Sequence, residues 1–113
     1  MNKAIIIGLI LTFGCIQFSH DEPDDLLDRD EMAKVMTEIH ILEARIYKLY
    51  LKPDSAKKLY EHFEPMLLDS LGVPKEQFDR SVDYYFTHDV KGFQKVYEVV
   101  VDSLLSRQKR EKN

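Results

Sequence analysis

Glu43 offers the most specific chemistry in this sequence, because a carboxylate stands where an apolar side chain is expected. At about 100° per residue, Glu43 lies about 40° from Ile39, which is the centre of an apolar helical stripe. A carboxylate held away from water must find hydrogen-bond donors, take up a proton or line an opening to solvent. The donors we expect around it are His40, Ser81, Tyr84 and Tyr85.

This expected cluster has several interpretations. It is either a satisfied polar network that holds the register of the helices, a small pocket for a ligand or partner, or an acid–base site. His40 and Glu43 are three residues apart, as metal ligands on one helix can be. The remaining histidines lack ligand spacing, however, so we expect neither a metal nor another cofactor. They are His20, His62 and His88.

Cys15 is the only cysteine, and it follows the pattern of an export signal. Lys3 supplies a positive start, residues 4–13 are almost entirely apolar, and Gly14 precedes the cysteine. The run is far shorter than the roughly 20 apolar residues of a membrane-spanning helix. Residues 11–15 resemble a bacterial lipobox, in which the cysteine thiol is lipidated and the cysteine becomes the new N-terminus.

We therefore predict a signal peptide over residues 1–14 and a membrane anchor, such as palmitate, on Cys15. Thr12 and Phe13 depart from the commonest lipobox pattern, and a secreted protein without lipid is the alternative. Residues 15–27 are acidic, contain Pro23 and lack helical periodicity, which predicts a flexible tether. The acidic residues are either a solvated spacer or an address that directs the protein to the cell surface.

Four helices are needed to position the candidate side chains. The first is predicted from Arg29 to Leu51, with Asp28 and Glu31 at capping-box spacing. The second follows a cap at Asp54 or Ser55, is kinked or broken by Pro65 near Glu61, and stops at Gly72. Pro74 opens a third helix that ends near Phe86, and Asp89 caps a fourth that contains the β-branched run at 99–101. The fold predicted is all-α, a small bundle of about four helices over residues 28–110, with a disordered tail at 111–113.

Composition limits the function further. The sequence has 16 basic and 20 acidic residues and a formal net charge of −4, so no face suited to nucleic acid is expected. It contains no glycine-rich phosphate loop and no serine elbow, and the sole cysteine is assigned to the anchor. We therefore do not expect an enzyme.

Two runs carry a resemblance to a known family. Residues 38–44 read as an acid, an apolar residue, His, two apolar residues, Glu and Ala, and residues 78–85 contain Phe78, Ser81 and a tyrosine pair. With the acidic segment before them, they resemble a family of small lipoproteins of Bacteroidetes that carry a domain of unknown function. The resemblance implies export, an outer-membrane setting and a shared helical domain, but no activity.

The function expected is therefore a membrane-anchored, non-catalytic helical module that interacts with a protein of the bacterial envelope. A ligand-binding or acid–base site around Glu43, His40, Tyr84 and Tyr85 is one alternative. A purely structural envelope protein is the other.

Overall fold

The part of the chain that the structure describes, residues 22–112 of a computed structural model, contains four α-helices and no strand. The prediction of an all-α bundle of about four helices is confirmed. The predicted signal peptide and Cys15 lie outside the described residues. The helices are α2 (Arg29–Tyr47), α3 (Pro53–Ser70), α4 (Lys75–His88) and α5 (Val90–Lys112).

A capping box begins α2, as the sequence predicts. The Glu31 backbone N–H donates to the Asp28 carboxylate at 2.8 Å, and the Asp28 N–H donates to the Glu31 carboxylate at 3.4 Å. Leu27 precedes the cap and Met32 lies one turn later, and both belong to the same buried cluster. This is the pattern of a hydrophobic staple, which fixes the angle at which the chain enters the helix.

The end of α2 is at Tyr47, earlier than the predicted end at Leu51. The Tyr50 N–H donates to the Tyr47 carbonyl at 3.2 Å, so the chain leaves the helix in a turn. Tyr50 has a φ of +54°, a left-handed backbone conformation that is rare for an aromatic residue. Pro53 disfavours helical backbone at the residue before it, and the chain must therefore leave the helix before α3 starts.

Pro53 is the first residue of α3, so the predicted start after a cap at Asp54 or Ser55 is wrong. The fixed φ of proline suits the first helical position, where its missing N–H is not needed. Of the kink or break predicted at Pro65, the break does not occur, since α3 continues to Ser70. Pro65 is exposed, so solvent can reach the backbone near the carbonyl that its ring leaves unbonded.

Gly72 ends α3 as predicted, with a φ of +73°. Its N–H donates to the Asp69 carbonyl at 3.0 Å, and the Val73 N–H donates to the Leu68 carbonyl at 2.9 Å. This pair of bonds is a Schellman motif, which satisfies the last carbonyls of the helix.

Asp89 caps α5, also as predicted. The Gly92 N–H donates to the Asp89 carboxylate at 2.9 Å. A Cβ at position 92 would lie 2.1 Å from a carboxylate oxygen of Asp89, so a larger residue there would force the capping side chain to shift. The helix includes the β-branched run 99–101 and extends to Lys112. The predicted disordered tail is therefore wrong for residues 111 and 112, and Asn113 lies outside the described residues.

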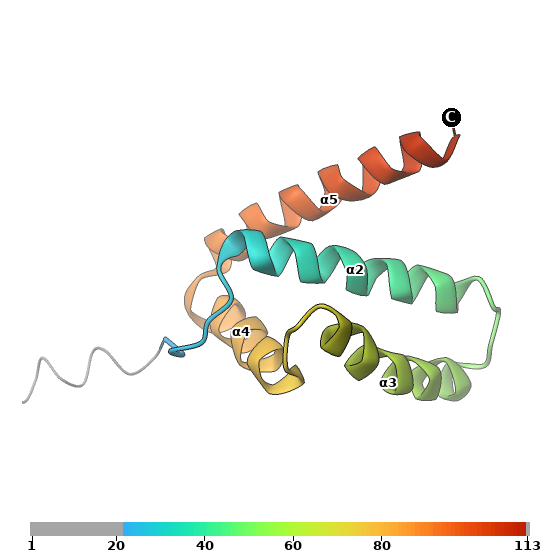
Figure 1. Cartoon of the computed structure of the whole chain (residues 1–113), viewed down its shortest axis with the longest axis horizontal. Coiled ribbons are helices and arrows are strands. Elements are labelled where there is room, and N and C mark those ends of the chain that lie inside the picture. Colours follow the sequence, from blue (N-terminus) through green and yellow to red (C-terminus); the bar gives the residue numbers. More distant parts are fainter. Residues whose placement is uncertain (1–21, 113) are drawn as a thin grey trace, which may run out of the picture.

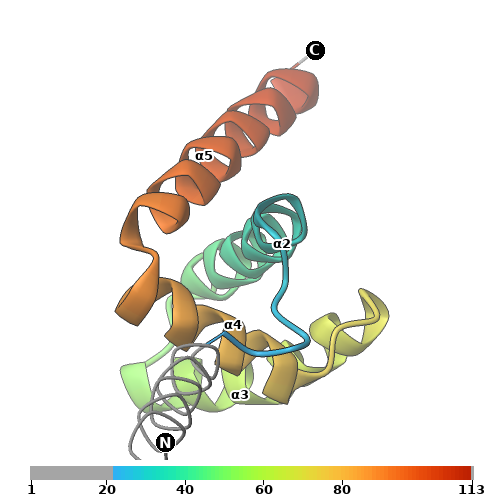
Figure 2. The same ribbon diagram turned by 90° about the vertical axis from the view of Figure 1, so that its left-hand side faces the viewer.

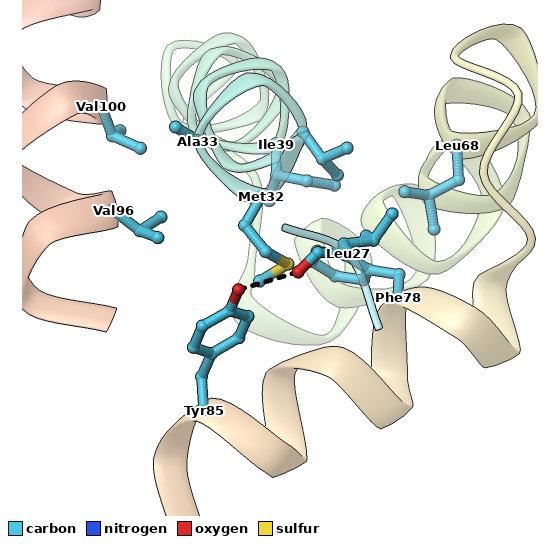
Figure 3. Packing of buried hydrophobic residues seen from close by; sticks show 10 residues of the cluster. Leu27, Met32, Ala33, Ile39, Leu68, Phe78, Tyr85, Val96 and Val100 are labelled. Carbon is cyan, nitrogen blue, oxygen red and sulfur yellow. Dashed lines mark hydrogen bonds between the residues drawn. The ribbon is translucent and has the colours of Figure 1, made fainter. Parts of the chain in front are cut away.

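In the bundle, α2 lies between α5 and α3 and packs against both (Figure 1). α4 crosses beneath the first half of α2 and connects the α3 side to α5 (Figures 1 and 2). The core lies where these elements meet (Figure 3). Its residues are Leu27, Met32, Ala33, Val35, Ile39, Leu68, Phe78, Tyr85, Val96 and Val100.

Candidate functional site

Ser81 and Tyr85, two members of the predicted polar cluster, both bind the backbone of Leu27. The Leu27 N–H donates to the Ser81 hydroxyl at 3.1 Å. The Tyr85 hydroxyl donates to the Leu27 carbonyl at 2.8 Å, as Figure 3 shows. Leu27 is 2% exposed and outside any helix, so its backbone groups need such partners. Burial raises the pKa of Tyr85, which keeps its hydroxyl protonated as a donor. These two side chains thus have a structural role.

Asp25 binds the same segment to α4 through two hydrogen bonds. The Arg80 guanidinium donates to the Asp25 carboxylate, and the Gln77 side-chain amide donates to the Asp25 carbonyl at 2.7 Å. The bond from Arg80 holds the pKa of Asp25 below its ordinary value. The prediction of a flexible tether as far as residue 27 is therefore wrong for residues 23–27, which lie along α4 (Figure 2). Apolar Leu27 is buried there, and the carboxylates of Asp25 and Asp28 on either side of it accept hydrogen bonds.

Glu43 does not lie in the core. Its side chain is 52% exposed, and its carboxylate is 3.5 Å from Nδ1 of His40. The expectation of a buried carboxylate is wrong because the buried stripe of α2 is narrow. Ile39 and Ile46, before and after Glu43, are buried, whereas Glu43, about 40° from Ile39 around the helix, is exposed.

Of the remaining candidates, Tyr84 meets the Tyr85 ring edge to face, with 6.1 Å between ring centroids, and His40 and Glu43 lie on α2. The His40 ring meets Tyr97 of α5 edge to face, with 5.7 Å between ring centroids. Its Nε2 atom is buried without a hydrogen-bond partner among the described residues. Tyr84 stacks on His88 at 5.2 Å. The five predicted residues therefore divide into a Leu27-binding pair, a His40–Glu43 pair and a stacked Tyr84, and they do not form a single site.

A polar cluster that the sequence reasoning missed joins α3 to α4. Glu64 is 9% exposed, and its carboxylate accepts from the Tyr60 hydroxyl at 2.5 Å and from Lys75 Nζ at 2.8 Å. Burial opposes ionisation of Glu64, but the bonds from Lys75 and Tyr60 outweigh it and hold its pKa below the ordinary value. Burial, and then the bond to Glu64, raise the pKa of Tyr60.

The same bonds explain why Lys75 stays charged. Its pKa is raised by the hydrogen bonds to Glu64 and then to Asp79, which lies at 3.1 Å. The sequence does contain a signal for this cluster: Glu64 follows Tyr60 and precedes Leu68 by four residues each, so it shares their helix face. All of its charges are paired, which is typical of a contact that fixes two helices.

The candidate interaction site is an aromatic strip, defined here as Phe86, Val90, Phe93, Tyr97 and Val101. Phe86 lies 4.5 Å from Phe93 between ring centroids, and Phe93 lies 6.2 Å from Tyr97. Except for half-buried Phe93, these side chains are 42–58% exposed. Phe93, Tyr97 and Val101 border a shallow depression of about 600 Å³ along α5 whose polar edge is Gln94, Glu98 and Asp102.

Two further properties bear on the chemistry of the described residues. Residues 22–112 contain no group of three or more His, Cys, Asp or Glu side chains arranged to hold a metal ion. None of the four helices has both the length and the apolar composition needed to cross a membrane. Among the described residues, the buried side chains of Thr37, Glu64 and Ser81 are hydrogen-bonded within the fold, whereas Nε2 of His40 is not.

Comparison with known proteins identifies the family to which the domain belongs. Residues 23–110 match the model of the family DUF4296, described as a domain of unknown function. No curated protein and no solved structure matches the chain. The match starts at Pro23, where the ordered segment begins to run along α4, so it includes Asp25 and Leu27 as parts of the domain. Because it spans most of the sequence, the chain belongs to the DUF4296 family.

Proposed function

We propose that this chain is a membrane-anchored lipoprotein of the bacterial envelope whose helical domain binds another protein and catalyses no reaction. The observation that supports the binding role is the aromatic strip. Tyr97 is 44% exposed and Phe86 is 58% exposed, although both lie beside other aromatic rings. Apolar side chains that gather on a surface in this way mark contact sites more often than isolated ones do.

The acidic residues at the edge of the strip indicate what charge a partner would carry. Glu98 and Asp102 stand beside Tyr97 and Val101 along one side of α5. A partner helix with apolar residues at helical spacing and Lys or Arg beside them complements both features. The partner in this proposal is therefore an amphipathic, basic helix that lies along α5.

The anchor in the proposal is lipid on Cys15, supported by the apolar run before it and by Gly14. Residues 16–22 would then connect the lipid to the segment that lies on α4. Seven residues span at most about 25 Å, so the domain would stay close to its membrane. The family resemblance favours the outer membrane.

The intact mass of the protein purified from its native membranes tests the anchor. We expect a chain that begins at Cys15 and carries the added mass of lipid, and a Cys15→Ser variant that loses this modification. An unmodified chain that is cut elsewhere, or not cut, would contradict the anchor. The binding role would then depend only on its own test.

A photo-crosslinking residue at Val101 tests the binding role. We expect one discrete crosslinked protein in the envelope, lost when Glu98→Lys and Asp102→Lys are added. Met66 on α3 is the matched control, because it is apolar and 57% exposed but distant from the strip in the fold. Equal crosslinking from both positions, or none from Val101, would favour a purely structural protein.

A further inference from the structure

The connection between α2 and α3 presents apolar side chains to solvent. We call residues 47–52 the tip. Tyr47 is 81% exposed, Leu49 57%, Tyr50 89% and Leu51 41%. Four large apolar residues within five positions are unusual for a connection, because such segments are normally polar. Folding does not explain them, since none of the four belongs to the core cluster or packs against it.

The tip has a defined conformation. Hydrogen bonds to the carbonyls of Ile46 and Tyr47 close successive turns after α2, and Pro53 restricts the chain on the other side. Tyr50 adopts a left-handed φ between these two constraints. The exposed rings are therefore held outward by the backbone.

Positive charge surrounds the tip. Residues 45–58 contain five basic residues and a single acid, Asp54, although the whole chain has a formal net charge of −4. The basic residues are Arg45, Lys48, Lys52, Lys57 and Lys58. The last turns of α5 lie beside the end of α2, since Glu111 and Lys48 line the same depression, and these turns add further basic residues. The aromatic strip has the opposite charge at its edge, with Glu98 and Asp102.

We infer that the tip inserts into the surface of a bilayer that contains anionic phospholipid. Tyrosine rings favour the boundary between headgroups and acyl chains, and leucine side chains favour the region below it. Basic side chains around such a segment are attracted to lipid phosphates, and the attraction adds to the gain from burying the apolar groups. The tip has tyrosine, leucine and basic side chains on one connection.

The shape and charge of the tip favour lipid over a protein partner. The connection lies at the end of the helical hairpin of α2 and α3 (Figure 1), its four apolar side chains are exposed, and the four depressions described on residues 22–112 are lined by other residues. A projecting apolar end ringed by flexible lysines fits a fluid surface, which can close around it. A second copy of the chain would instead bring like charges together.

The tip also lies at the opposite end of α2 from residue 22 (Figure 1). A helix of 19 residues is about 28 Å long. A domain that touches one membrane at both ends therefore lies with α2 along the surface. The inference goes beyond the proposed function and does not require lipid on Cys15.

Tryptophan fluorescence tests the inference, because the chain has no tryptophan. The experiment uses the full chain with Cys15→Ser and either Tyr50→Trp at the tip or Phe86→Trp on the strip as the matched control. Both proteins carry the same residues 1–21, so any binding through that segment affects them alike. Each is mixed with vesicles of phosphatidylcholine alone or with phosphatidylglycerol, including brominated lipids that quench tryptophan on contact.

We expect a blue shift and quenching for Tyr50→Trp with the anionic vesicles, and neither for Phe86→Trp. Adding Lys48→Glu and Lys52→Glu should weaken the response at least about tenfold. Equal responses from the two positions, or no response at position 50, would overturn the inference. A blue shift at position 50 without vesicles that grows with protein concentration would also overturn it, in favour of self-association.

Discussion

At the α4 end of the domain, Leu27 is 2% exposed and both of its backbone polar groups are bonded to buried side chains. At the tip, Tyr50 is 89% exposed and has a disfavoured backbone angle. Both are large residues in non-helical segments next to α2. The α4 end therefore stabilises the fold, whereas the tip exposes apolar surface that folding does not require. Substitutions at the two ends should have opposite consequences for stability and binding.

The largest loss of stability should follow Leu27→Ala. The change leaves a cavity among Met32, Leu68 and Phe78 and should destabilise the domain by about 2 to 5 kcal/mol. Urea unfolding followed by circular dichroism measures this. Leu49→Ala at the tip is the control and should change stability by no more than about 0.5 kcal/mol. Similar losses of stability at both positions would show that the tip contributes to folding as much as the α4 end does.

Glu64→Ala should have the next largest effect, a loss of about 1 to 3 kcal/mol, because it removes the acceptor of the Tyr60 hydroxyl and one of the two carboxylates bonded to Lys75. Thermal unfolding at pH 7 tests this. Glu61→Ala is the control, since Glu61 is exposed on the same helix. Equal melting temperatures for the two variants would show that the cluster adds nothing to the joint between α3 and α4.

Glu64 also predicts a dependence of stability on pH. Its pKa in the folded protein lies below the ordinary value of 4.5, so its contribution is fully present above about pH 4.5 and is lost as the pH falls through the lower folded pKa. Unfolding of the native chain and of Glu64→Gln between pH 7 and pH 3 measures this. The difference between their free energies of unfolding should shrink with acid. A constant difference would contradict the assignment.

Tyr85→Phe should cost about 1 to 2 kcal/mol, because it leaves the buried Leu27 carbonyl without its donor while keeping the ring. Amide hydrogen exchange adds a local test, since the segment 23–27 should lose protection before the middle of α2 does. Tyr84→Phe is the matched control from the adjacent position. If the two variants exchange alike, residues 23–27 are held by other contacts.

Tyr50→Gly should stabilise the domain by up to about 1 kcal/mol, because glycine adopts a left-handed backbone without steric cost. It should also reduce the response to anionic vesicles, since the exposed ring is removed. A melting curve and a vesicle sedimentation assay measure the two effects. A loss of stability would show that Tyr50 makes a folding contact, and the contrast between the two ends would fail.

Glu43→Ala should have the smallest effect, within about 0.5 kcal/mol, because an exposed carboxylate near His40 contributes little. Denaturant unfolding at neutral pH is sufficient. A loss of 1 kcal/mol or more would restore the idea of a buried network around Glu43.

The candidate site could be predicted only in part, and the reason differs for each residue. Ser81 and Tyr85 were predicted as donors to Glu43; both are buried, but their partner is the backbone of Leu27, which no side-chain pattern identifies. Glu43 was misplaced because a helical wheel does not show how wide the covered stripe is, and only the direction of Ile39 and Ile46 is buried. Glu64 was missed although its spacing from Tyr60 and Leu68 follows the same rule.

Local rules in the sequence by themselves determined the helical class, the caps at Asp28 and Asp89 and the stop at Gly72, because each depends on residues within one or two turns. Tertiary structure decided which stripes are covered, that residues 23–27 belong to the domain, and that the tip is left exposed. Those outcomes depend on where α4 lies relative to α2. That placement results from contacts between residues more than 50 positions apart, such as Leu27 with Ser81 and Tyr85, which local periodicity does not encode.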